Sequence, residues 1–206
     1  MRLKLPKIYP ITDASISGIS HTEQVKRLIA GGAKIVQLRE KSLPPLDWFE
    51  DAQNAARLCR ENGVMLIVND RVDVALAIGA EGVHLGQTDL PPAAARLLLG
   101  DKAVIGFSTH TLEQAREAVA FPVDYIAFGP VFSTATKKDA DAVVGLEMLR
   151  QVREIAGEMP LVAIGGISLS NARSVLVAGA DSLAMIGALV ADPSIIEERI
   201  KEFSRL

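Results

Sequence analysis

The sequence predicts a single-domain α/β protein, a (β/α)₈ TIM barrel that spans residues 1–206. Eight short runs rich in Val, Ile and Leu alternate with segments of helical periodicity. Several of these runs are apolar at every position, which is typical of parallel strands that are covered on both faces. A glycine-alanine pair also precedes three of the strands, as a repeated strand–helix unit requires, at Gly32-Ala33, Gly79-Ala80 and Gly179-Ala180.

The eight predicted strands are residues 7–12, 34–39, 65–69, 82–85, 104–107, 125–129, 161–164 and 182–186. Apolar residues recur three or four positions apart in the predicted helices, which are residues 22–30, 46–62, 72–78, 92–99, 112–120, 146–155, 170–177 and 195–203. Asn62-Gly63 and Ala156-Gly157 are typical helix ends. A doubly wound open sheet is the alternative architecture. We find no linker or change of composition that would divide the chain.

Composition and charge narrow the classes of function. The chain has 22 Lys and Arg residues against 25 Asp and Glu residues, and this net charge of −3 argues against a basic nucleic-acid-binding surface. The single cysteine, Cys59, excludes a disulfide framework or a Cys-rich zinc site and favours a reducing, cytoplasmic location. No apolar run reaches the ~20 residues of a membrane span, so neither a signal peptide nor a membrane partner is expected.

The candidate site residues follow the predicted strands, because the active site of a barrel of this kind lies at the carboxyl ends of its strands. The second strand ends in Gln37-Leu38-Arg39-Glu40-Lys41, and alternation places Gln37, Arg39 and Lys41 on one side. Two cations and an amide suit a polyanion such as diphosphate. A solvated, charged strand end is the alternative interpretation.

Carboxylates follow the third and fourth strands, at Asp70 and Asp89. Neighbouring strand ends would bring them together, and two carboxylates can hold Mg²⁺, which prefers oxygen ligands and is often completed by phosphate. Each residue taken alone also suits the start of a helix. The cationic motif on the adjacent strand favours the metal.

Further polar residues follow the fifth to eighth strands. Ser108 can donate to a phosphate, and His110 is either an acid or base or a residue near a helix start that binds nothing. The segment after the sixth strand offers Thr134, Thr136 and Lys137 to a phosphate, with a solvated loop as the alternative. Glycines after the last two strands, Gly166 and Gly187, let backbone N–H groups approach an anion.

Four other residues have structural interpretations. Trp48 is expected to cover the barrel and Cys59 to be a small packed residue. His21 precedes a predicted helix and is expected at the surface. His84 ends the fourth strand, where a hydrogen-bonded structural role is expected.

Several motifs occur in a fixed order along the chain: Tyr9-Pro10-Ile11-Thr12-Asp13, Gln37-Leu38-Arg39-Glu40-Lys41, Val68-Asn69-Asp70-Arg71-Val72-Asp73-Val74-Ala75, Gly82-Val83-His84-Leu85-Gly86-Gln87-Thr88-Asp89-Leu90, Asp124-Tyr125, Phe128-Gly129-Pro130-Val131-Phe132, Thr134-Ala135-Thr136-Lys137 and Ala163-Ile164-Gly165-Gly166-Ile167. Each motif is weak alone, but the ordered set is specific. It resembles the thiamine-phosphate synthase (thiamine-phosphate pyrophosphorylase) family over essentially the whole chain.

The resemblance implies a Mg²⁺-dependent alkyl transferase of thiamine biosynthesis. It would join 4-amino-5-hydroxymethyl-2-methylpyrimidine diphosphate to 4-methyl-5-(2-phosphoethyl)thiazole by a dissociative mechanism, and release thiamine phosphate and diphosphate. Carried over residue by residue, the pyrimidine diphosphate would contact Gln37, Leu38, Arg39, Glu40, Lys41, Asn69, Ser108 and Lys137. The thiazole phosphate would contact Thr134, Ala135, Thr136, Gly166, Ile186 and Gly187.

By the same resemblance, Asp70 and Asp89 would hold Mg²⁺, and Arg39, Lys41 and Lys137 would stabilise charge on the leaving diphosphate. The chain departs from the family at Gly187, where serine is usual, and at Ser133, where proline is common.

Three alternative functions remain open at this point. A thiazole tautomerase would use His110 as its acid or base. A non-catalytic barrel could bind phosphate ligands. A sugar-phosphate isomerase or aldolase would explain the glycines after the last strands but not the cations and carboxylates. A homo-oligomer is compatible with the sequence.

Overall fold

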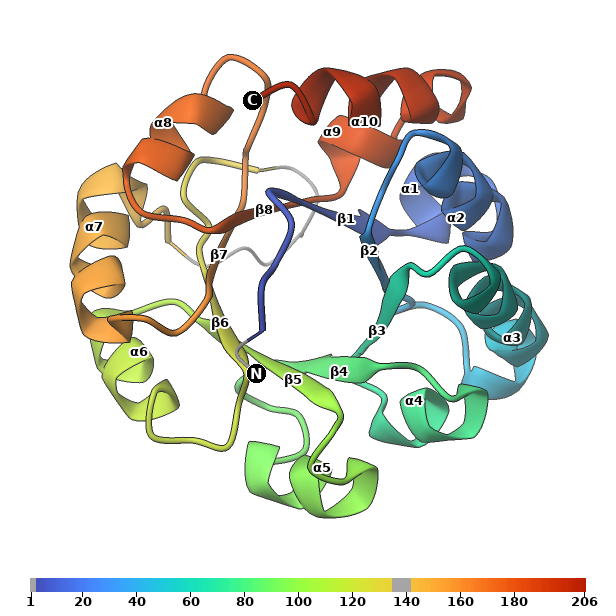
Figure 1. Ribbon diagram of the computed structural model, residues 1–206, viewed down its shortest axis with the longest axis horizontal. Helices are drawn as coiled ribbons and strands as arrows, with labels where there is room; N and C mark the ends of the chain where they lie inside the picture. The colour runs from blue at the N-terminus through green and yellow to red at the C-terminus, as the bar shows by residue number, and fades with distance from the viewer. Residues whose placement is uncertain (1–2, 135–141) are drawn as a thin grey trace.

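The computed structural model describes residues 3–134 and 142–206. In these residues eight parallel strands close into one barrel in chain order, and β1 completes the ring by pairing with β8. Figure 1 looks along the barrel, with the strands around the centre and the helices in an outer ring. The predicted (β/α)₈ barrel is confirmed, and the open sheet is excluded because the first and last strands are neighbours.

The strands are β1 (Ile8–Thr12), β2 (Ile35–Leu38), β3 (Met65–Asn69), β4 (Gly82–Leu85), β5 (Val104–Thr109), β6 (Tyr125–Phe128), β7 (Leu161–Ile164) and β8 (Ser182–Met185). The helices are α1 (Ala14–Ser17), α2 (His21–Ala30), α3 (Pro45–Glu61), α4 (Val72–Ile78), α5 (Pro92–Leu99), α6 (Leu112–Ala118), α7 (Gly145–Ala156), α8 (Ala172–Val177), α9 (Gly187–Val190), the 3₁₀ helix η1 (Pro193–Ile195) and α10 (Ile196–Phe203). The short elements α1, α9 and η1 are additions to the predicted pattern.

Both faces of the strands are buried, which explains their continuous apolar sequences. Successive residues of β6 illustrate the alternation, since Tyr125 and Ala127 belong to the cluster inside the barrel. Ile126 and Phe128 point outward and pack in the larger cluster between strands and helices. Side chains such as Tyr125 and Ala127 therefore pack the barrel interior. A polar side chain enters this interior when it occupies an inward-facing position of a strand.

At the amino ends of β6 and β8, the aspartate directly before the strand binds the first residues of the preceding strand. Asp124, before β6, accepts from the Ile105 N–H of β5 and from Arg96 Nη2, both at 2.8 Å. Asp181, before β8, makes the same pair of contacts with Leu161 N–H and Arg153 Nη1, again at 2.8 Å. These contacts satisfy backbone donors that the strand ladder leaves unpaired.

Replacing Asp124 with alanine should lower the free energy of unfolding by about 1–3 kcal/mol, because the Ile105 N–H and the Arg96 guanidinium both lose an acceptor. Urea denaturation measures the change. Asp101→Ala, at an exposed position before β5, is the matched control and should stay within about 0.5 kcal/mol of the parent chain. Equal stability of the two variants would contradict the role given to Asp124.

The expectation that His21 lies at the surface is wrong. Its side chain is buried, with Nδ1 2.7 Å from Thr12 Oγ1 and Nε2 3.4 Å from Glu40 Oε2. Both ring nitrogens thus have a partner inside the protein, and the ring packs against Trp48. Trp48 and Cys59 are buried in the outer core as predicted.

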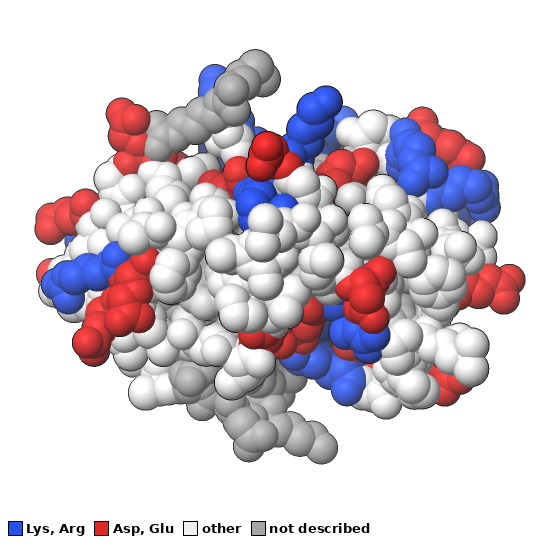
Figure 2. Space-filling view, turned by 90° about the horizontal axis from the view of Figure 1, so that it is seen from below, with Lys and Arg blue, Asp and Glu red and all other residues white. Residues whose placement is uncertain are grey.

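The surface carries both signs of charge. Figure 2 shows Lys and Arg interspersed with Asp and Glu over the face in view. Along residues 3–134 and 142–206, no helix combines the length and apolar character that crossing a bilayer requires.

Candidate active site

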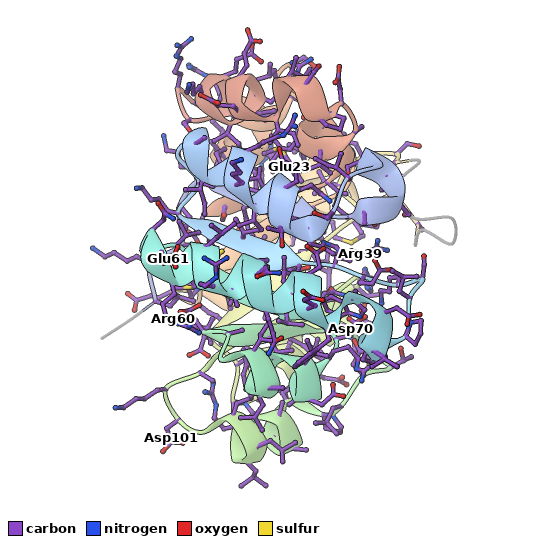
Figure 3. All side chains as sticks on the ribbon, turned by 90° about the vertical axis from the view of Figure 1, so that its right-hand side faces the viewer. Glu23, Arg39, Arg60, Glu61, Asp70 and Asp101 are labelled. Carbon is purple, nitrogen blue, oxygen red and sulfur yellow. The ribbon has the colours of Figure 1, made fainter. Side chains whose placement is uncertain are left out.

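A cavity of about 830 Å³ opens at the carboxyl ends of the strands. All eight strands, or the loops that follow them, contribute to its lining. It brings together most of the residues predicted from the sequence, namely Gln37, Arg39, Lys41, Asn69, Asp70, Asp89, Ser108, Thr134, Gly166, Ile186 and Gly187. In Figure 3, Arg39 and Asp70 lie toward one end of the barrel, and Arg60 and Glu61 lie toward the other.

Two of the predicted site residues, Leu38 and Glu40, do not line this cavity. The side chain of Leu38 is fully buried in the outer core, because alternation along β2 turns it away from Gln37. Glu40 faces a second hollow beside His21, where its Oε1 accepts from the N–H of Ser42 at 2.7 Å. Three further predicted residues, Ala135, Thr136 and Lys137, lie outside the described residues.

The two cations after β2 are each paired with a carboxylate. Arg39 forms an ion pair with Asp13, whose other oxygen accepts from the Ile16 N–H and so begins helix α1. Lys41 forms an ion pair with Asp70. The buried Asp13 fixes the direction of Arg39, and the half-exposed Lys41 side chain reaches across from β2 to the end of β3. Sequence reasoning gave Asp13 no role, although it lies in the first motif.

The carboxylates of Asp70 and Asp89 lie beside each other, as predicted from neighbouring strand ends. Burial raises the pKa of Asp70, the hydrogen bond from Lys41 lowers it, and the contact with Asp89 raises it again. Neither residue caps a helix, because α4 begins after Arg71 and α5 begins after Pro91. The helix-start interpretation of both residues is therefore wrong.

The backbone at Asp70 has a conformation that is uncommon for residues other than glycine. Its φ is 61°, and it is the one non-glycine residue with positive φ in the part of the chain that the structure describes. A 2.8 Å hydrogen bond from its N–H to the His84 carbonyl holds this conformation. Asp89 is fixed by accepting from the Gly86 N–H at 2.7 Å. Strained residues of this type cluster at functional sites.

The donor chemistry of this pair fits a magnesium ion. Carboxylate oxygens are preferred Mg²⁺ ligands, and a cation between them would relieve their repulsion. No cluster of three or more His, Cys, Asp or Glu side chains suited to a metal occurs within residues 3–134 and 142–206. Asp70 and Asp89 would therefore supply two ligands, and waters and phosphate oxygens would supply the rest.

An unsatisfied donor lies next to this pair. Asn69 Nδ2 is one of two buried side-chain nitrogens or oxygens without a hydrogen-bond partner among the described residues. Buried polar groups are nearly always paired, so this donor on the cavity wall is available to an acceptor from a ligand or a water molecule. Its place beside Asp70 suits a phosphate oxygen.

Sequence reasoning missed the two tyrosines at the base of the cavity. Tyr9 and Tyr125 are the only tyrosines of the chain, and their hydroxyl oxygens lie 2.7 Å apart inside the barrel. Their inward positions on two largely apolar strands are the signal that could have found them. Tyr125 OH also lies 3.0 Å from His84 Nδ1. The predicted hydrogen-bonded role of His84 is confirmed, and burial lowers its pKa to about 4, so the ring is neutral near neutral pH.

His110 also lines the cavity, and its Nδ1 lies 2.7 Å from the Gly129 carbonyl oxygen. Because a carbonyl oxygen only accepts, Nδ1 carries the proton. In the loop after β7, Gly165 and Gly166 have φ values of 99° and 64°. A Cβ on Gly166 would lie 2.4 Å from the Ser133 carbonyl oxygen, so only glycine allows the loop after β7 to pack against residues 130–133.

The comparisons with known proteins assign the family. A family model described as "Thiamine monophosphate synthase" matches residues 8–189. The chain belongs to this family. The thiamine-phosphate synthase of Chloroflexus aurantiacus is 48% identical over 90% of this chain and 85% of its own length. The corresponding protein of Albidiferax ferrireducens is 45% identical over 98% of this chain and 93% of its own length.

A solved thiamine-phosphate synthase shares the fold as well. The structure titled thiamine phosphate pyrophosphorylase, from Pyrococcus furiosus, is 38% identical with a TM-score of 0.87, and the match covers 97% of this chain and 94% of that one. A 2-keto-3-deoxy-6-phospho-gluconate aldolase from Zymomonas mobilis is similar only in fold, at 18% identity and a TM-score of 0.72. The chain is therefore an enzyme of the transferase class, from a family whose activity is the formation of thiamine phosphate.

Proposed function

We propose that the chain joins 4-amino-5-hydroxymethyl-2-methylpyrimidine diphosphate to 4-methyl-5-(2-phosphoethyl)thiazole in a Mg²⁺-dependent, dissociative reaction. One observation carries the proposal. The Asp70–Asp89 pair and the cations Arg39 and Lys41 share one cavity with the glycine-lined wall at Gly166. Two separate anion-binding regions in one cavity suit a transferase that acts on two phosphorylated substrates.

The diphosphate would bind between β2 and β4. Arg39 and Lys41 supply positive charge, and the unpaired Asn69 Nδ2 supplies a neutral donor. Asp70 and Asp89 would hold Mg²⁺, which when bound would neutralise charge on the diphosphate oxygens. The position of Asp70, which pairs with Lys41 and lies beside Asp89, supports this arrangement.

The thiazole phosphate would bind at the other wall. Thr134, Gly166, Ile186 and Gly187 line it, and backbone N–H groups near the two glycines can donate to phosphate oxygens. The family resemblance adds Ala135, Thr136 and Lys137 to the two substrate sites. These three residues stay a prediction, as they lie outside the described range.

The proposed chemistry requires no nucleophilic side chain. The bond from the pyrimidine methylene carbon to the diphosphate oxygen breaks, and its electron pair leaves with diphosphate. The thiazole nitrogen then forms the new bond to that carbon. Arg39 and Lys41 would stabilise the developing negative charge, and holding both substrates in one cavity supplies the remaining acceleration.

Release of diphosphate from the purified protein tests the proposal. We expect release only when both substrates and Mg²⁺ are present, with thiamine phosphate formed in equal amount. Diphosphate release without Mg²⁺ would remove the metal from the proposal. Isomerisation of the thiazole carboxylate phosphate without any release would instead indicate a tautomerase, with His110 as the residue to substitute. The cytoplasmic location and the oligomeric state remain predictions.

A further inference from the structure

Five side chains form a continuous chain of hydrogen bonds through the barrel, and each comes from a different strand. Gln37 Nε2 lies 3.2 Å from Tyr9 OH, which lies 2.7 Å from Tyr125 OH. Tyr125 OH lies 3.0 Å from His84 Nδ1, and His84 Nε2 lies 2.8 Å from Ser108 Oγ. The two ends of this chain, Gln37 and Ser108, both line the cavity.

One direction of the chain gives every hydroxyl proton inside the barrel an acceptor. The Gln37 amide nitrogen can only donate, so the Tyr9 oxygen accepts from it, and within the chain the Tyr125 oxygen is the acceptor left for the Tyr9 proton. The Tyr125 proton then goes to His84 Nδ1. A neutral imidazole that accepts at Nδ1 carries its proton on Nε2, which donates to Ser108 Oγ. The hydroxyl proton of Ser108 is left to point at the cavity.

The barrel is built to hold this chain in place. Gly106 of β5 lies against it, and a Cβ there would be 2.1 Å from Tyr125 Cζ and 2.5 Å from His84 Nδ1. The His84 and Tyr125 rings stack with centroids 5.5 Å apart, and Tyr9 meets Tyr125 edge-on at 5.9 Å. Rings packed in this way cannot turn to other partners, so the packing fixes which atoms of the chain meet.

We infer that Tyr9, Tyr125 and His84 are positioning residues, which hold Ser108 as a preorganised hydrogen-bond donor toward the reacting substrate. A serine hydroxyl usually rotates to suit its surroundings, and this chain removes that freedom by occupying the acceptor side of the oxygen. A donor aimed in advance at a developing negative charge needs no reorganisation during the reaction. The inference rests on the proposed function, since the acceptor would be an oxygen of the departing diphosphate.

The protonation site of the His84 ring tests the direction without any substrate. Nitrogen NMR of the free protein distinguishes the two ring tautomers, and comparison with the His84→Asn spectrum assigns the signals among the three histidines of the chain. We expect the proton on Nε2 in the parent protein and a mixture of tautomers in Tyr125→Phe. A proton on Nδ1 in the parent would reverse the chain and overturn the inference.

A double-mutant cycle on kcat tests whether the chain acts through Ser108. We expect Ser108→Ala to lower kcat by about 10²-fold and Tyr125→Phe to lower it by about 10-fold. The double variant should match Ser108→Ala alone, because Tyr125 has nothing left to orient. Losses that multiply, or a Tyr125→Phe effect confined to KM, would overturn the inference. Tyr9→Phe breaks the same chain one link away and should behave as Tyr125→Phe does.

Ile126→Val is the matched control for a loosened barrel. Ile126 follows Tyr125 on β6 but packs in the outer core, so the variant should keep both the His84 tautomer and kcat. A parent protein that releases no diphosphate would end the proposed function, while the NMR result would still decide the direction of the chain. The two failures are therefore distinguishable.

Discussion

Alanine in place of Asp70 or Asp89 should lower kcat by about 10²- to 10³-fold. Each variant should also need at least about 10-fold more Mg²⁺ for its half-maximal rate. The reason is that each carboxylate is half of the oxygen donor set that the two strand ends bring together. Titration of the initial rate of diphosphate release with Mg²⁺, at saturating concentrations of both substrates, measures both changes.

Asp73→Ala is the matched control for this pair. Asp73 lies three residues after Asp70, in the first turn of α4, and its exposed carboxylate pairs with Arg71 outside the cavity. Asp73→Ala removes one negative charge close to Asp70 in the sequence but none from the cavity. We therefore expect the Mg²⁺ titration of Asp73→Ala to match that of the parent protein. Titrations of Asp70→Ala and Asp89→Ala that coincide with that of the parent protein would refute the metal assignment.

Methionine in place of Lys41 should lower kcat by about 10²-fold while leaving the free energy of unfolding nearly unchanged. The methionine keeps most of the apolar stem and removes the ammonium group, so the effect reports the charge. Lys41 is half exposed, and its ion pair with Asp70 contributes little to stability. Rapid-quench measurement of the chemical step separates a loss of charge stabilisation from slower product release.

Lys34→Met provides the control, since Lys34 is exposed just before β2 and Lys41 follows the same strand at its other end. Diphosphate formation in Lys34→Met should stay within roughly twofold of the parent rate, as expected for a surface site away from the cavity. Equal rates in the two lysine variants would show that the charge of Lys41 plays no part in the reaction.

The barrel was predictable because its strands have a simple sequence signal. The apolar runs at 65–69 and 161–164 coincide with β3 and β7, and both are covered on each face by inner and outer core residues. The predictions fail where local chemistry ends an element. Residues 34–39 are expected as one strand, but β2 stops at Leu38, whose pairing partner Thr12 is the last residue of β1. The short helix α1 depends on Asp13 accepting from Ile16, a contact too local for periodicity to indicate.

The part of the site that could be predicted from the sequence is the part that follows from the order of the strands. Asp70 and Asp89 meet because β3 and β4 are neighbours, and this neighbourhood follows from the fold alone. The tyrosine pair was not predictable in the same way. Tyr9 and Tyr125 are 116 residues apart, and β1 and β6 are not adjacent in the barrel, so their contact depends on side chains that cross its interior. His21 was misplaced because its partners Thr12 and Glu40 come from two different strand ends.

The Lys41–Asp70 ion pair has a consequence for how the two proposed ligands affect each other's affinity. A diphosphate that draws Lys41 away leaves Asp70 uncompensated beside Asp89, and a cation that draws Asp70 away leaves Lys41 without its counter-ion. If both ligands bind, the two charges exchange partners and the local balance is preserved. Each ligand should then raise the affinity for the other by the same factor, since such coupling is reciprocal. At the proposed site, this exchange of partners would favour binding of the metal together with diphosphate over binding of either ligand alone.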